Sequence, residues 1–163
     1  MYPELELIME RRKLWFLCSL IMVGVSAALL LTGSQILLYP LHESENIPLG
    51  TFTTWAGIIC LPLSVYLGIK ELRKPSSIMN KILASLLKGI LSLSILWAPI
   101  SYLLAGNFSF TFSGTEDLQG GQEAMKIFWV FSYSIVIGTL LIFVLYWLKT
   151  IMNKGFQKPP NSS

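Results

Sequence analysis

The chain has 163 residues, of which 53% are hydrophobic and only 13% are charged, and its formal net charge at pH 7 is +3. Its mean hydropathy is +0.63. Soluble domains carry about 25% charged residues, so this composition excludes an ordinary water-soluble protein. The basic residues form no domain with interleaved aromatic residues, which argues against nucleic-acid binding.

Long uncharged runs predict an all-α integral membrane protein. About 20 apolar residues in a helix cross a hydrocarbon core of about 30 Å, and backbone groups in lipid must bond within their own segment. The expected transmembrane helices cover residues 14–39, 51–70, 82–105 and 127–148. They form one four-helix domain over residues 14–152, between an N-terminal tail at 1–13 and a disordered tail at 153–163.

The first span carries a possible processing signal and two kinds of contact residue. Its basic start, Arg11–Lys13, is typical of a signal peptide, but the apolar run continues to Tyr39. Signal sequences have apolar regions of about 7–15 residues, so an uncleaved anchor is favoured. Gly24 and Ala28 lie four residues apart and predict a close helix contact. Gln35, near the outer end, is a candidate for a hydrogen bond between helices.

The second span carries the clearest packing pattern. Small residues recur at every fourth position along one helix face, at Ala56, Cys60, Ser64 and Gly68. Small side chains let helix backbones approach closely in lipid, so this span is expected to be the most closely packed.

Two prolines and one lysine distinguish the middle of the chain. Pro62 and Pro99 each remove a helix hydrogen bond and predict a kink, with a hinge or substrate path as the alternative. Lys88 is the clear ionisable candidate within the spans. Counting the residues that follow it places it near the cytoplasmic boundary, where its stem would snorkel to the headgroups. A pair with Glu71, or a functional role, is the alternative.

Beyond the third span, the pattern changes to a two-residue alternation. Phe108, Phe110 and Phe112 alternate with hydroxyl residues, which predicts an extended segment over residues 107–113. The rings either cap the helix bundle or form a contact strip for a partner, together with the acids Glu116 and Asp117.

The basic residues predict the orientation. Eleven of the twelve Lys and Arg residues lie in the two tails, in the loop between spans two and three, or just inside span three. By the positive-inside rule both termini are cytoplasmic. Attraction to anionic lipid is a further role for these residues. A multi-pass protein of the bacterial cytoplasmic (inner) membrane is expected.

No motif predicts catalysis or a cofactor. His42, Glu43 and Glu45 lack the ligand spacing of a zinc site, and Cys18 and Cys60 stand alone, as small packing residues do. Phosphate-binding loops and nucleophile elbows are absent. The prediction is a non-enzymatic protein without metal or cofactor that binds another membrane protein. An accessory or assembly subunit, and an oligomeric channel or transporter, are the alternatives, and homo-oligomers are compatible with each.

The layout resembles the inner-membrane immunity proteins that protect bacteria against pore-forming colicins. The resemblance covers the short length, the four spans with cytoplasmic termini and the loop that enters at Asn107–Gly114, and it carries no specific motif. It implies that the protein binds the pore domain of a toxin within the bilayer.

Overall fold

The computed structural model describes residues 3–41, 47–105 and 121–156. These residues are nearly all helical. They contain no β-strand, only an isolated β-bridge between Pro40 and Pro48. Four of the described helices are long and apolar enough to cross a membrane. The predicted all-α class is therefore confirmed, with four helices that have the length and apolar composition of membrane spans. The predicted extended segment 107–113 lies outside the described residues.

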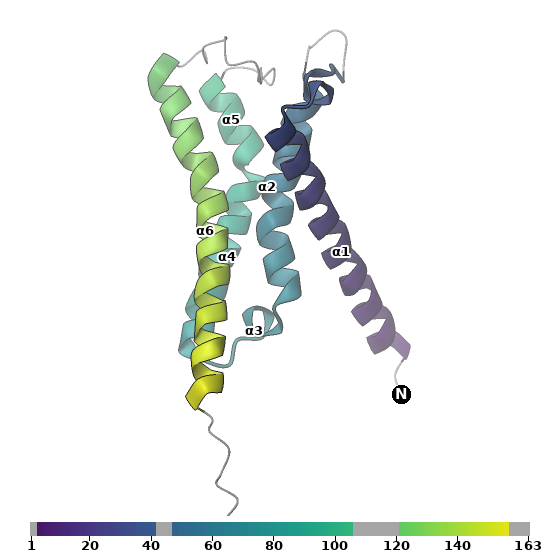
Figure 1. The fold of residues 1–163 in the computed structure, drawn as a ribbon, viewed down its shortest axis with the longest axis vertical. Helices are drawn as coiled ribbons and strands as arrows, with labels where there is room; N and C mark the ends of the chain where they lie inside the picture. The colour runs from purple at the N-terminus through teal and green to yellow at the C-terminus, as the bar shows by residue number, and fades with distance from the viewer. Residues whose placement is uncertain (1–2, 42–46, 106–120, 157–163) are drawn as a thin grey trace, which may run out of the picture.

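The helices run nearly the full length of the described chain (Figure 1). Their bounds are α1 Pro3–Thr32, the 3₁₀ helix η1 Gln35–Leu38, α2 Leu49–Gly68, α3 Lys70–Arg73, α4 Ile78–Ile95, α5 Trp97–Ala105 and α6 Gly121–Phe156.

Both ends of the first span differ from the prediction. Residues 3–13 belong to α1 rather than to a tail, because this segment is rich in Glu and Leu, which favour helix, and has proline only at its first position. The helix ends at Thr32 instead of continuing to residue 39. Gly33 takes the left-handed conformation with φ 59°, its N–H donates to Leu30 O, and the N–H of Ser34 donates to Leu29 O. This pair of bonds is a Schellman motif, which closes a helix C-terminus.

The third span consists of two helices, and the last span is longer than predicted. Helix α4 ends at Ile95 and α5 begins at Trp97, so Pro99 marks a break rather than a kink within one helix. Helix α6 runs on to Phe156, so the predicted start of the C-terminal tail at residue 153 is wrong. Pro62, in contrast, lies inside α2, which continues past it to Gly68.

The break before Pro99 is stabilised by a side chain from another helix. Proline has no N–H to donate to the carbonyl four residues earlier, which is that of Ile95. The indole Nε1 of Trp55 in α2 donates to this carbonyl at 3.3 Å and to Ser94 O at 3.2 Å. The half-buried Trp55 therefore points toward the break between α4 and α5, where these acceptors lie.

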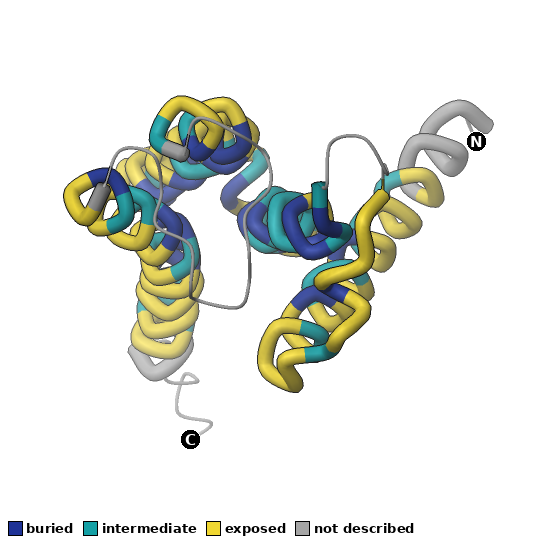
Figure 2. The backbone as a smooth tube through the Cα atoms, turned by 90° about the horizontal axis from the view of Figure 1, so that it is seen from above, coloured by how far each residue is buried: buried dark blue, intermediate teal, exposed yellow. Residues whose placement is uncertain are grey.

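Helix α2 is the centre of the assembly. It packs against α1 on one side and against α4 and α6 on the other, while α4 also packs against α6. Helix α1 packs mainly against α2 and diverges from α6 toward the end at which the chain begins (Figure 1). Seen from above, buried residues gather where helices face one another, and the outer faces are exposed (Figure 2).

The contact between α1 and α2 is close at two glycines. A Cβ atom on Gly57 would lie 2.7 Å from the Cβ of Ser26, and one on Gly68 would lie 2.9 Å from the ring of Phe16. The Ser26 hydroxyl donates to Thr53 O at 2.9 Å. Backbone approach and an interhelical hydrogen bond, rather than apolar area, therefore hold α1 in place.

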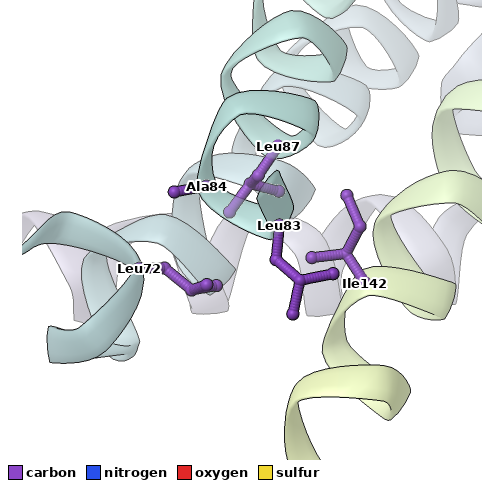
Figure 3. Packing of buried hydrophobic residues seen from close by; sticks show 5 residues of the cluster. All are labelled: Leu72, Leu83, Ala84, Leu87 and Ile142. Atoms are coloured by element: carbon purple, nitrogen blue, oxygen red, sulfur yellow. The ribbon is translucent and has the colours of Figure 1, made fainter. Parts of the chain in front are cut away.

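Two buried clusters join the helices from α2 to α6. The one nearer the chain termini contains Leu72, Leu83, Ala84, Leu87 and Ile142 (Figure 3). The other contains Ile58, Trp97, Ala98 and Ile135. In the second cluster the indole of Trp97, which is 2% exposed, donates to Ser132 Oγ at 2.8 Å. This bond satisfies a polar group that would otherwise be costly to bury.

Candidate functional site

One face of α4 is polar and exposed although the helix is long and apolar enough to cross a membrane. Lys81, Ser85, Lys88 and Ser92 recur at intervals of three or four residues, so they lie along one face, and all four are exposed. Gly89 lies beside this row, and a Cβ atom on it would meet nothing within 4 Å. We call these five residues the α4 polar face.

The opposite side of α4 packs into the protein. Leu83, Leu87 and Ser94 are buried toward α2 and α6. Of the four spans, α4 is the clearly amphipathic one. In a water-soluble protein an exposed polar face is ordinary, but on a membrane span the same face meets hydrocarbon, where apolar side chains are expected.

The contact between α4 and α6 places Lys88 near the level of the middle of the uncharged stretch of α6. A Cβ atom on Gly138 would lie 2.9 Å from Ile90 Cδ1, so these two residues stand at the same level. Gly138 lies about midway between Lys126 and Lys149, which bound the uncharged stretch of α6. Lys88 precedes Ile90 by two residues, about 3 Å along the helix.

The expected position of Lys88 near the cytoplasmic boundary stays a prediction. Helix α4 begins at Ile78, ten residues before Lys88, which corresponds to about 15 Å of helix. Side chains in a helix lean toward its N-terminus, so the ammonium points toward the end that carries the basic residues. The four-carbon side chain of Lys88 spans roughly half, or less, of the distance from Lys88 to the start of α4.

Lys88 has no side-chain partner among the described residues, in contrast to Lys149 near the end of α6. The Lys149 ammonium donates to Ser77 Oγ at 2.7 Å and to Asn80 Oδ1 at 2.5 Å. The alternative pair of Lys88 with Glu71 is not found among the described residues. Glu71 instead accepts a hydrogen bond from the Tyr146 hydroxyl at 2.8 Å, and the cations that act on it are Lys70 and Arg73.

The end of the molecule near the chain termini gathers basic groups. It holds the start of α1, α3 and the last turns of α6 (Figure 1). Partial burial lowers the pKa of Arg73, and the nearby Arg12 lowers it further. The Tyr146 hydroxyl, by its hydrogen bond, lowers the pKa of Glu71 below its usual value. The Arg73 guanidinium also donates to Leu67 O near the end of α2. These hydrogen bonds link α3 to α2 and α6, and α3 packs against α2 and α4.

The predicted packing residues of α1 face away from α2. Gly24 and Ala28 are exposed, and a Cβ atom on Gly24 would meet nothing within 4 Å. Ser19 and Ser26, seven residues apart, face α2 instead. Two rows of small residues run along α1, and spacing alone does not distinguish them.

Two of the four small residues predicted in α2 lie against α1. Gly68 contacts Phe16 of α1, Cys60 lies beside Ser19, and Ser64 is buried with its hydroxyl bonded to Leu61 O. Ala56 is half-buried. Of the four spans, α2 has the largest buried share.

The remaining predicted residues do not converge on a site. Gln35 is exposed at the start of η1, beside a shallow apolar depression, and makes no side-chain hydrogen bond within the described chain. Phe108, Phe110, Phe112, Glu116 and Asp117 lie outside the described residues, as do His42, Glu43 and Glu45.

The α4 polar face was not predicted as a unit, although Lys88 was singled out. Its pattern is legible in the sequence, since the four polar residues occupy positions i, i+4, i+7 and i+11. No protein family model, no curated protein and no solved structure matches the chain. The residues themselves therefore carry the argument about function.

Proposed function

We propose that this chain is a membrane-embedded binding protein that holds another membrane protein against the α4 polar face. The observation that carries the proposal is the exposure of Lys88 near the middle of a span. A lysine at the centre of a transmembrane helix costs about 2.5–3.5 kcal/mol on insertion scales. Lipid chains offer no hydrogen bond in return, whereas a second protein does.

The proposed orientation puts both termini in the cytoplasm of a bacterial cell. It is supported by the basic groups that the fold gathers at one end, since such groups are retained on the cytoplasmic side. Reporter fusions test it: fusions after residues 45 and 115 are expected to read as outside, and fusions after 75 and 160 as inside. A fusion after residue 75 that reads as outside would reverse the orientation.

Within this class we propose immunity to a pore-forming bacteriocin as the specific role, with an accessory or assembly subunit as the alternative. An immunity protein must recognise helices that a toxin inserts into the bilayer. A polar face that is open to lipid along α4 suits that task, since a helix that arrives within the membrane reaches it directly. An accessory subunit would use the same face for a permanent partner.

The exposed polar residues of the α4 polar face favour an oligomeric channel as a second candidate, but the charge of Lys88 counts against it. Other hydroxyls of this span do not contribute a lining, because Ser94 and Ser101 are buried within the chain. Any pore lining would therefore come from the α4 polar faces of several copies. Each added copy would bring another Lys88 toward the same axis, and like charges repel at such distances.

Photocrosslinking tests the proposed function. A benzoylphenylalanine at position 92 lies on the α4 polar face, and one at position 137 lies at a similar depth on the exposed side of α6. We expect position 92 to form an adduct with one distinct membrane protein, which mass spectrometry identifies. The reverse experiment, with the photoreactive residue placed in that protein, is expected to capture this chain. Position 137 is expected to give none. Adducts that are identical at both positions would contradict the proposal, and adducts of two copies of this chain would favour the channel.

A further inference from the structure

We infer that the partner bound by the α4 polar face is a transmembrane helix that carries a carboxylate near the middle of its span. The inference rests on the proposed function and adds the chemistry of the partner. It starts from the ammonium of Lys88, which has no side-chain partner in the part of the chain that the structure describes. Lys88 is exposed, about 3 Å along the helix from the level where Ile90 meets Gly138.

The charge of the partner follows from the low dielectric around Lys88. An opposite charge interacts much more strongly there than in water, and charged residues within membranes characteristically pair with one another. A carboxylate is the protein group that matches an ammonium in both charge and hydrogen bonding.

A second copy of this chain does not supply that carboxylate. The spans hold no Asp or Glu over residues 14–32, 49–68, 78–105 and 127–153. A partner copy packed on the same face would instead bring its own Lys88 close to the first. The occupant is therefore a different protein.

The shape of the α4 polar face admits a helix at short range. Ser85 and Gly89 flank Lys88 on its exposed side, and the position of a Cβ on Gly89 is open. Small residues of this kind let two helix backbones approach closely. The Ser85 hydroxyl lies one turn before Lys88, where it is able to donate to a second carboxylate oxygen. A buried ion pair is favourable only when such additional bonds satisfy it.

The test uses synthetic transmembrane helices as probes. The purified full-length chain is reconstituted in phosphatidylcholine vesicles at pH 8 and titrated with a Leu/Ala helix of about 24 residues that carries one central Glu. A matched helix carries Gln at the same position, and association is followed by energy transfer. We expect the Glu helix to bind at least about tenfold more tightly than the Gln helix, which corresponds to about 1.4 kcal/mol.

Variants assign that preference to Lys88. Lys88→Met is expected to remove the preference, and Lys88→Arg to keep it. Lys81→Met, on the same face but seven residues closer to the membrane surface, is also expected to keep it. Equal binding of the two helices to the unmodified chain, or a preference that survives Lys88→Met, would overturn the inference.

Anionic lipid is the competing occupant, and the same assay tests it. If Lys88 serves a lipid headgroup, vesicles containing phosphatidylglycerol will abolish the Glu preference, and that result also overturns the inference. Failure here is distinct from failure of the proposed function. A specific adduct from position 92 together with no Glu preference would leave the binding function standing and reject the carboxylate.

Discussion

Replacing Gly57 by alanine is expected to separate α1 from α2. The new methyl group would lie 2.7 Å from the Cβ of Ser26 and 2.8 Å from its hydroxyl oxygen. Carbon atoms do not approach that closely, so one helix must shift. The shift also threatens the hydrogen bond from Ser26 to Thr53 O, the interhelical bond at this contact.

The magnitude follows from comparison with Gly24, which lies on the exposed side of α1. Alanine is favoured over glycine within a helix by roughly 0.5–1 kcal/mol, and this gain applies to both positions. Overpacking costs about 1–3 kcal/mol at Gly57 and nothing at Gly24. Gly57→Ala is therefore expected to be less stable than Gly24→Ala by about 1–3 kcal/mol, and by about 1 kcal/mol more where the Ser26 bond is lost.

Unfolding in mixed dodecyl maltoside and SDS micelles, followed by circular dichroism, measures this difference. The double variant Gly57→Ala with Ser26→Gly restores the space and is expected to recover part of the loss. Equal stability of Gly57→Ala and Gly24→Ala would refute the close contact between α1 and α2. A double variant no more stable than Gly57→Ala alone would show that Ser26 is not the obstacle.

Two further predictions concern contacts of α6. Ser132→Ala removes the acceptor for the buried indole of Trp97 and is expected to cost about 1–3 kcal/mol in the same unfolding assay, while the exposed Ser134→Ala costs little; equal losses would argue against this bond. The pKa of Glu71 is lowered in the folded protein, so its contribution to stability is present above the ordinary glutamate pKa of about 4.3 and is lost as the pH falls through the lowered value. Tyr146→Phe removes the main cause of that shift and should flatten the acid limb of the unfolding midpoint against pH; an unchanged limb would contradict this assignment.

The spans were predictable from the sequence because hydrophobicity and length determine whether a segment crosses a membrane. The uncharged runs located the four helices that are long and apolar enough to span a membrane, and Pro99 predicted a distortion in the third. The helix end at Gly33 and the full break at Leu96 were not predicted. Such breaks depend on local partners: Ser34 completes a Schellman motif, and Trp55 supplies a donor from a distant helix. A hydropathy pattern contains neither contact.

The faces of the helices were less predictable than their positions. Gly24 and Ser26 lie on nearly opposite sides of α1, and each belongs to a regular row of small residues. Gly57 of α2 lies against Ser26, so the row that contains Ser26 is the one that faces α2. The depth of Lys88 likewise required the pairing of Ile90 with Gly138, since only a contact between helices aligns two spans along the membrane normal.

Affinity purification in mild detergent shows whether the α4 polar face binds a membrane protein. The unmodified chain is compared with a variant that carries Ser85→Leu, Lys88→Leu and Ser92→Leu. These positions are exposed, so the variant is expected to insert and fold normally and to lose the membrane protein that the unmodified chain retains. Recovery of that protein at the unmodified level, from a variant shown to be folded, would contradict the account.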